Sequence, residues 1–185
     1  NGTLWVGTIY GNINKFDPNT ETFLYKNISD LINIPLEQAD DFYEYPLSFS
    51  RNQKTTITSI AEDKDGKLWI GTWGNGLIVI DKNFNKYNHF YSDAKNPNGL
   101  RSNRIMDLLF DKDGKLWIAT FGGGLTRITK SINNSKEAFS FETLEKGEND
   151  FSLSDDKLLN IFEDTEKNIW IGSYYGGLIL IPNDQ

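Results

Sequence analysis

One short pattern occurs four times along this chain, and it constrains the fold more than any other feature of the sequence. Two full copies run over residues 63–77 and 111–125, where Asp-Lys-Asp-Gly-Lys-Leu-Trp-Ile leads into a threonine, an aromatic residue and a glycine-rich turn. A third copy lies at 166–178, and the first copy opens mid-pattern at 1–8. Four of the five tryptophans therefore share one position of a structural repeat: Trp5, Trp69, Trp117 and Trp170.

The spacing of these copies discriminates between the architectures that repeats can build. The segment from Trp5 to Trp69 is much longer than the segment from Trp69 to Trp117. Unequal spacing favours units joined by surface loops that are free to differ in length, as in a β-propeller, over a tightly stacked solenoid.

Within each unit, apolar residues alternate between turn residues, which predicts four short strands. The strands of the second unit are expected at 56–62, 67–72, 76–81 and 86–91. Those of the third unit are expected at 105–110, 115–120, 124–129 and 138–143, and those of the fourth at 158–163, 168–173 and 177–181. Gly66 supplies the positive φ that a tight hairpin needs. Lys167 replaces this glycine in the fourth copy, so we expect the turn to re-form around Asn168, a residue type that tolerates the left-handed region.

These units predict an all-β fold, a β-propeller fragment of about four four-stranded antiparallel blades. The first and last blades are incomplete, because the chain starts at the second strand of its first unit and stops after the third strand of its last. We therefore expect an open flank on each side, covered by the remaining blades of a larger propeller, by a partner chain or by crystal neighbours. We assign blade 1 to residues 1–26 with a long link at 27–53, blade 2 to 54–91, blade 3 to 104–143 and blade 4 to 157–185. Pro35 predicts a short helix over residues 36–42 of the link.

The composition limits the partners that the chain can have. A formal net charge of -7 and a pI near 4.8 disfavour nucleic acid, because a polyanion would be repelled. The absence of cysteine excludes disulfides and thiolate metal sites. No apolar run approaches the roughly 18 residues of a membrane span, so we expect no membrane contact by this segment. The chain shows no signal peptide, but it begins inside a repeat, so this does not argue against export.

The sequence Leu-Trp-Ile-Gly-Thr, followed by an aromatic residue and Gly-x-Gly-Leu and preceded by Ile-x-x-Ile-x-x-Asp, resembles the two-component regulator propeller repeat over nearly the whole chain. The resemblance implies a periplasmic sensor domain of a Bacteroidetes hybrid two-component system, in which two seven-bladed propellers and a β-sandwich domain precede a membrane span and a histidine kinase. It also implies sensing of nutrients, often breakdown products of complex carbohydrates, by a homodimer of the parent sensor anchored in the inner membrane. Three departures from the pattern are Ala119, the pair Asn12-Ile13 and Lys167.

The residues common to the copies are better explained by roles in packing and turns than by binding a sugar, a metal ion or a phosphate. A tryptophan inside a strand, between apolar neighbours, is expected to pack between blades rather than to serve as a sugar platform. The Asp-x-Asp-Gly segments lack the further ligands of a calcium loop, so Asp63, Asp111 and Asp164 are expected to accept backbone N–H bonds in hairpin turns. The run Gly122-Gly123-Gly124 lacks the helix that follows a phosphate loop. We expect neither a metal nor a cofactor.

The residue after Thr or Ser changes from copy to copy, being isoleucine first and then Trp73, Phe121 and Tyr174. In a propeller these loops and the links between blades meet at the mouth of the central channel. Aromatic faces with nearby amide and guanidinium donors suit a sugar ring, whose C–H face stacks while its hydroxyls form hydrogen bonds. The predicted ligand-binding residues are Trp73, Asn75, Tyr174, Tyr175, Arg101, Asn103 and Arg104. The alternative is that these side chains only pack loop against loop.

No catalytic residue is predicted. The single histidine, His89, is expected in an outer strand beside Phe90 and Tyr91, far from the channel mouth, and it lacks an evident acid or base partner. No pair of carboxylates recurs at a spacing that predicts a glycosidase. Three functions stay open: a ligand-sensing module that signals to a histidine kinase, a dimerisation or protein-interaction scaffold with the ligand bound elsewhere, and a propeller lyase or glycosidase, which the position of His89 disfavours.

Overall fold

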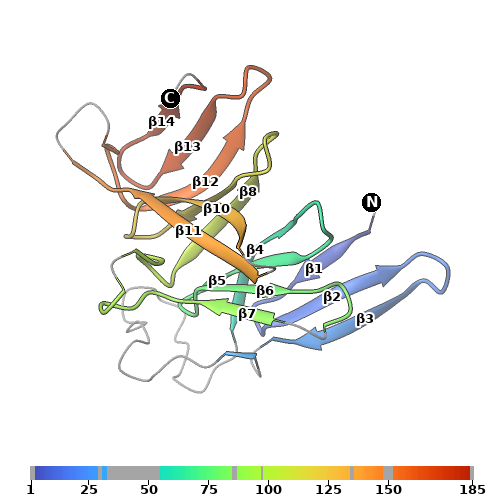
Figure 1. The fold of residues 1–185 in the computed structure, drawn as a ribbon. Coiled ribbons are helices and arrows are strands. Elements are labelled where there is room, and N and C mark those ends of the chain that lie inside the picture. Colours follow the sequence, from blue (N-terminus) through green and yellow to red (C-terminus); the bar gives the residue numbers. More distant parts are fainter. Residues whose placement is uncertain are drawn as a thin grey trace.

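The structure is a computed structural model that describes residues 3–28, 31–32, 55–84, 87–96, 98–133, 136–147 and 152–183. These residues form four antiparallel sheets of three or four strands (Figure 1). In the ranges just given, no helix has the length and apolar character needed to cross a membrane. The helix predicted over residues 36–42 lies outside the described residues.

Each sheet is a simple antiparallel meander in chain order. The first sheet contains β1 (Trp5–Gly7), β2 (Asn12–Asp17) and β3 (Thr22–Asn27). The second contains β4 (Thr56–Glu62), β5 (Leu68–Trp73), β6 (Leu77–Ile80) and β7 (Tyr87–Phe90). The third contains β8 (Ile105–Phe110), β9 (Leu116–Thr120), β10 (Leu125–Asn133) and β11 (Lys136–Leu144). The fourth contains β12 (Leu158–Glu163), β13 (Ile169–Ser173) and β14 (Leu178–Ile181).

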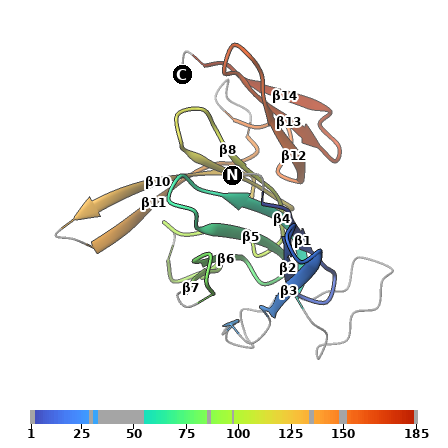
Figure 2. The same cartoon turned by 90° about the vertical axis from the view of Figure 1, so that its right-hand side faces the viewer.

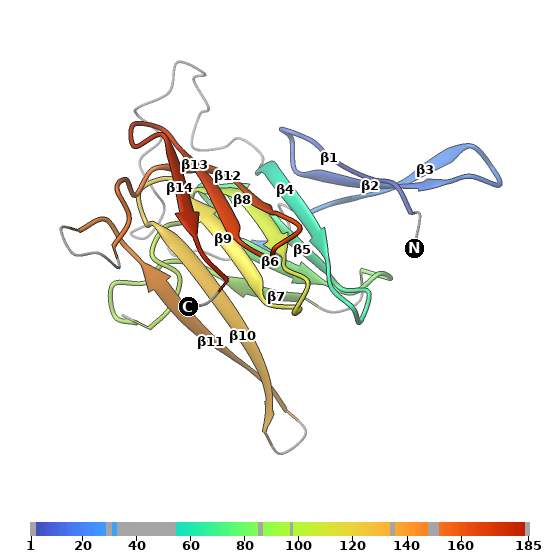
Figure 3. The ribbon, with the colours of Figure 1, turned by 90° about the horizontal axis from the view of Figure 1, so that it is seen from above.

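The sheets follow one another as blades. Strand β4 contacts β8, and β8 contacts β12, so the first strands of successive sheets lie side by side (Figure 3). This arrangement is that of a propeller segment, as the repeat predicts. The bounds of β4, β8 and β12 coincide with the predicted ranges, because alternation and a tight turn are local signals.

The hairpin of the third sheet is longer than predicted. Strands β10 and β11 pair from Leu125 with Leu144 out to Asn133 with Lys136, and they project beyond their sheet (Figure 2). Strand β11 of this hairpin contacts the second sheet, where the ring centroid of Phe139 lies 5.6 Å from that of Trp69 and 5.2 Å from that of Phe90. Contacts with a neighbouring sheet therefore support an extension that the repeat pattern does not encode.

The core consists of three apolar clusters, one between each pair of neighbouring sheets. Trp69, with 3% of its surface exposed, packs against Ile105 and Ile118 of the third sheet. Trp117, with 7% exposed, packs against Leu158 and Ile171 of the fourth. The prediction that the repeated tryptophan is a core residue between blades is confirmed for these two copies.

A carboxylate at the hairpin turn fixes the tryptophan of the same unit. In the third unit, Asp111 Oδ1 accepts the backbone N–H groups of Asp113 and Lys115, as predicted, and Asp111 Oδ2 also accepts the Trp117 indole N–H at 2.8 Å. Asp63 with Trp69 and Asp164 with Trp170 repeat the indole bond at 3.0 and 2.8 Å. The bond from Trp170 is the main cause that holds the pKa of the Asp164 carboxyl below its ordinary value. The Asp and the Trp are six residues apart in each of these units, and this spacing brings the carboxylate to the indole N–H. This bond was not among the features predicted from the sequence.

The prediction for the fourth turn is wrong. Lys167 itself adopts the left-handed conformation, with φ of 66°, where Gly66 and Gly114 stand in the earlier copies. The turn keeps the register of the earlier copies, because Asp164 Oδ1 accepts the Asn168 N–H as Asp63 Oδ1 accepts that of Lys67. The Lys167 ammonium also binds Asp113 Oδ1 of the preceding turn at 2.7 Å.

A close approach between blades requires glycine at position 71. A Cβ added there would lie 2.6 Å from Cγ2 of Ile105 in the next sheet. The third unit has Ala119 at the equivalent position, and Ala119 packs in the cluster that contains Leu158, a residue not branched at Cβ.

We expect Gly71→Ala to lower the free energy of unfolding by about 1–2 kcal/mol, because the added methyl group overpacks the interface. The double variant Gly71→Ala, Ile105→Leu reproduces the Ala119 and Leu158 pair and should recover most of this loss. Urea unfolding of the intact protein measures both changes. A neutral Gly71→Ala, or a double variant less stable than the single one, would contradict the interface.

Each outer sheet has an exposed apolar face. On the fourth sheet, Phe162 is 64% and Leu178 66% exposed, and on the first sheet Val6 is 38% and Phe23 50% exposed. Trp170 is only half-buried, unlike its equivalents Trp69 and Trp117. The predicted open flanks are therefore present in the described part of the chain.

Candidate functional site

Four aromatic side chains, which we call the aromatic row, lie at the end of the second strand in three successive sheets. They are Trp73, Phe121, Tyr174 and Tyr175. The ring centroids of Trp73 and Phe121 are 5.6 Å apart, and those of Phe121 and Tyr174 are 5.7 Å apart. Tyr175 stands perpendicular to Tyr174 at 4.6 Å. Residues that differ between copies of the repeat are thus brought into one continuous group.

The row passes from the interior to the surface. Phe121 is buried with 7% exposed, and Trp73 is half-buried. Tyr174 is 47% and Tyr175 75% exposed. The two tyrosines are therefore the part of the row that a ligand can reach first.

Backbone pairing between sheets places these rings. Trp73 of the second sheet forms a β-bridge with Arg104 of the third, and Phe121 of the third forms one with Lys157 of the fourth. Phe121 N donates to the Arg104 carbonyl oxygen at 2.8 Å within the third sheet. Arg104 and Lys157 thus occupy equivalent places, each immediately before a first strand.

Both cations lie over aromatic rings. The Arg104 guanidinium is 5.7 Å from the centroid of the Trp73 ring. The Lys157 ammonium is 5.4 Å from the Phe121 ring and 5.5 Å from the Tyr175 ring. The negative face of an aromatic ring attracts such cations, so each cation helps to hold the rings in place.

A buried carboxylate supports the exposed tyrosines. Asp155 is 4% exposed, and its Oδ2 accepts the N–H groups of Tyr175 at 2.6 Å and Gly176 at 3.1 Å. Its Oδ1 accepts the Lys157 N–H at 3.1 Å. Burial alone would raise the pKa of Asp155, but these backbone N–H bonds outweigh burial, and its pKa lies below the ordinary value.

The structure places the seven predicted residues in two groups. Trp73, Tyr174, Tyr175 and Arg104 lie together in or on the aromatic row. The others lie in supporting or peripheral positions: Asn75, Asn103 and Arg101.

Asn103 supports the loop instead of facing outward. Its side chain is buried, its Oδ1 accepts the Ser92 N–H at 2.7 Å, and its carbonyl oxygen accepts the N–H groups of Gly74 and Gly76. The Asn75 Nδ2 faces Thr55 Oγ1 at 3.4 Å. Arg101 lies at the surface and pairs with Glu145 at 3.2 Å.

Sequence reasoning left three members of this site off its candidate list. Phe121 stands at one of the variable positions but is not among the predicted ligand-binding residues, and it is the centre of the row. Lys157 and Asp155 were not singled out. The register shared by Arg104 and Lys157, directly before the first strands, is the signal that identifies Lys157.

His89 lies in the outer strand β7, as predicted, but its side chain reaches the loop that carries Asn75. The Nε2 atom is 2.7 Å from the Asn75 carbonyl oxygen, so the expectation that the imidazole is remote from these loops is wrong. Burial lowers the pKa of His89, which favours the neutral imidazole as a donor to that oxygen. This hydrogen bond indicates that His89 supports the conformation of the loop that carries Asn75.

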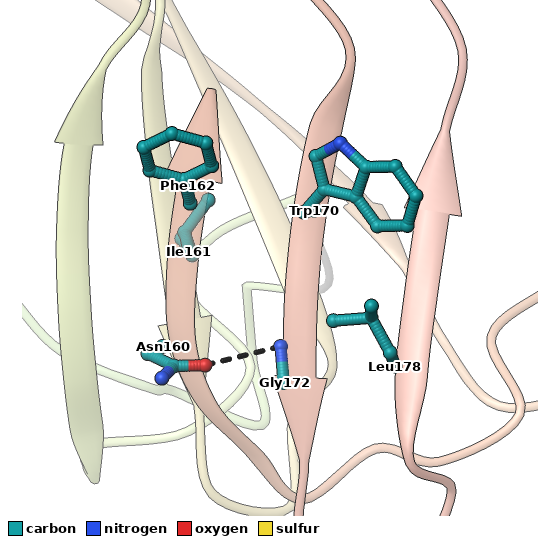
Figure 4. Close-up of a pocket in the computed structure, with 6 residues that line it drawn as sticks. All are labelled: Asn160, Ile161, Phe162, Trp170, Gly172 and Leu178. Carbon is teal, nitrogen blue, oxygen red and sulfur yellow. Dashed lines mark hydrogen bonds between the residues drawn. The ribbon is translucent and has the colours of Figure 1, made fainter. Parts of the chain in front are cut away.

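The described residues contain no group of three or more His, Asp or Glu side chains that could hold a metal ion. A shallow pocket of about 450 Å³ lies on the fourth sheet (Figure 4). Its lining consists of Asn160, Ile161, Phe162, Trp170, Gly172 and Leu178. The equivalent face of the third sheet, which bears Trp117, is packed against the fourth sheet, so this pocket belongs to a blade-packing face.

Comparison with known proteins identifies the repeat. The model of the two component regulator propeller family matches residues 53–74 and 99–122, which contain the first two strands of the second and third sheets. No curated protein matches the chain significantly.

Solved structures share the fold at low identity. The chain resembles the extracellular domain of a hybrid two component system from B. thetaiotaomicron, with a TM-score of 0.61 and 23% identity over 96% of this chain and 20% of that one. It also resembles virginiamycin B lyase from Staphylococcus aureus, with a TM-score of 0.55 and 13% identity over 100% of this chain and 53% of the lyase. The β-propeller domain of Cps50 (Swd1) from Myceliophteria thermophila gives 0.56 and 14% over 98% and 49%.

The chain spans about a fifth of the length of the first of these structures and about half the length of the other two. At these identities the likeness concerns the fold alone. The second and third units therefore match the two component regulator propeller repeat, and the chain as a whole shares the propeller fold of these structures.

Proposed function

We propose that this chain is part of the extracytoplasmic sensor domain of a hybrid two-component system, that it binds an oligosaccharide or a similar nutrient at the aromatic row, and that binding is passed on to a histidine kinase. The observation that carries the proposal is the row itself, which joins variable residues of three sheets and ends in the exposed rings of Tyr174 and Tyr175. Exposed aromatic faces beside polar donors suit a sugar ring. The match to the propeller repeat family and the fold shared with the extracellular domain of a hybrid two component system support the location.

Calorimetric titration of the intact protein with a panel of oligosaccharides tests this site. We expect Trp73→Ala and Tyr174→Ala each to weaken the binding of the sugar that the panel identifies by about fivefold, because a stacked ring contributes on the order of 1 kcal/mol. Tyr25→Ala is the matched control, since Tyr25 is 73% exposed on the first sheet, away from the row. Unchanged affinity in both row variants would exclude this site.

A second candidate function rests on the apolar faces of the outer sheets. Phe162 and Leu178 expose the kind of surface that proteins bury against a partner. In this alternative the propeller serves as a dimerisation scaffold, and the ligand binds elsewhere. Loss of the dimer in Leu178→Asp, with ligand affinity indifferent to Trp73→Ala and Tyr174→Ala, would favour the scaffold.

A further inference from the structure

Two cationic side chains lie against the rings of the aromatic row, and they are not part of the repeated pattern. Arg104 and Lys157 stand directly before β8 and β12, and the equivalent residue before Ile57 in the second sheet is Thr56. Thr56 bonds through its hydroxyl to the Ile9 carbonyl oxygen, so a neutral side chain stands at that junction where Arg104 and Lys157 stand at the other two. The cations are therefore features of two particular blade junctions, at which the exposed rings also lie.

The Lys157 ammonium is held between two rings without a carboxylate. It lies 5.4 Å from Phe121 and 5.5 Å from Tyr175. Among the residues that the structure describes, no carboxylate lies within ion-pair distance of the Lys157 ammonium.

The carboxylate of Asp155, two residues before Lys157, is engaged with backbone donors. Both oxygens of Asp155 accept backbone N–H groups, those of Lys157, Tyr175 and Gly176. The depressed pKa of Asp155 fits a carboxylate already satisfied by these donors. The ammonium of Lys157 therefore keeps its capacity to pair with a negative charge from outside.

We infer that the ligand of the aromatic row is an acidic oligosaccharide, whose oxyanion pairs with the Lys157 ammonium while a sugar ring lies against Tyr174 and Tyr175. This inference rests on the proposed function and specifies its ligand class. A cation partly shielded from water by aromatic rings binds an anion more strongly than a freely hydrated lysine does. The net charge of -7 repels anions in general, so a local cation at the exposed end of the row adds selectivity for a ligand that also contacts the rings.

The oxyanion can be a uronate carboxylate or a sulfate ester, and three probes separate these sources. They are a galacturonic acid tetrasaccharide, the same tetrasaccharide with its carboxyl groups reduced, and a sulfated galactose tetrasaccharide. Titration of the intact protein should show at least one charged probe binding about fivefold more tightly than the reduced one. The charged probe that binds more tightly identifies the anion. Raising the salt concentration should narrow the difference.

Variants at position 157 test the contact directly. Lys157→Gln should reduce the affinity for the preferred charged probe to that of the reduced probe, and Lys157→Arg should preserve it. Lys64→Gln, in the hairpin turn that joins β4 to β5 away from Trp73, is the matched control and should change nothing. Equal binding of reduced and charged probes, unaffected by Lys157→Gln, would overturn the anion inference and leave the proposed sugar site intact. Binding of none of the three probes would also overturn the anion inference, while the panel titration decides separately on the proposed sugar site.

Discussion

Replacement of Trp117 by alanine is expected to lower the free energy of unfolding by about 3–5 kcal/mol, the largest effect of any single change considered for this protein. Trp117 fills the interface between the third and fourth sheets, where it packs with Leu158 and Ile171. Its removal would leave a cavity between two blades and would also remove the indole donor from Asp111. Urea unfolding of the intact protein, followed by far-ultraviolet circular dichroism, measures the loss.

Two further variants separate packing from the hydrogen bond. Trp117→Phe keeps a ring but removes the indole N–H, so it should cost less than the alanine variant. Asp111→Ala removes the acceptor for the indole and for the N–H groups of Asp113 and Lys115 while leaving the ring in place. A Trp117→Ala protein as stable as the wild type would show that the repeated tryptophan does not build the core.

The second large effect is expected at Asp155. Asp155→Asn should lower the free energy of unfolding by about 2 kcal/mol at neutral pH, because an amide places N–H donors against the backbone N–H groups that the carboxylate accepts. The Tyr175 N–H binds one carboxylate oxygen and the Lys157 N–H binds the other. In either orientation of the amide, one of these two N–H groups loses its acceptor. The substitution should also weaken ligand binding, since this carboxylate fixes the turn that presents Tyr174 and Tyr175.

The stabilisation by Asp155 depends on pH in a defined direction. The folded-state pKa lies below the ordinary value of 3.8, so the unfolded chain takes up a proton first as the pH falls. The stabilisation is fully present above the unfolded pKa and is lost as the pH falls through the folded pKa. Unfolding measured between about pH 7 and pH 3 should show a constant gap between wild type and Asp155→Asn above about pH 5, narrowing below about pH 4. A gap that widens in acid would contradict this role.

Local signals in the sequence predicted the strands well. The bounds of β4, β8 and β12 follow from alternating apolar residues that end at an Asp-Gly or Asp-Thr turn. Such alternation and turn chemistry act within a few residues, so they can be read without knowledge of the fold. The burial of Trp69 and Trp117 followed from the same pattern.

Features that depend on neighbouring sheets could not be read in this way. The left-handed Lys167 forms an ion pair with Asp113 of the preceding unit, a contact that its own turn does not encode. The long β10–β11 hairpin depends on contacts of Phe139 with the second sheet. These are tertiary effects that override local turn and strand preferences.

The candidate site was predictable as a region but not in its composition. Variable positions after the second strand pointed to Trp73 and Tyr174, and the structure brings these rings into one row through Phe121. Asn103 was predicted to face the ligand, but its side chain is buried beneath the loop. Which polar residue of a link faces outward depends on how that link folds over the sheets, and periodicity does not report this.

We propose that the residues common to all copies of the repeat build the blades, while the residues that differ between copies bind the ligand. Hydrogen–deuterium exchange of the intact protein, with and without the oligosaccharide identified by titration, tests this claim most directly. We expect bound ligand to slow exchange at the loops of the aromatic row, residues 121–124 and 173–177, and to leave the hairpin turns at 63–67 and 111–115 unchanged. Protection that appears at saturating ligand elsewhere in the protein, with no change at the loops of the aromatic row, would contradict it.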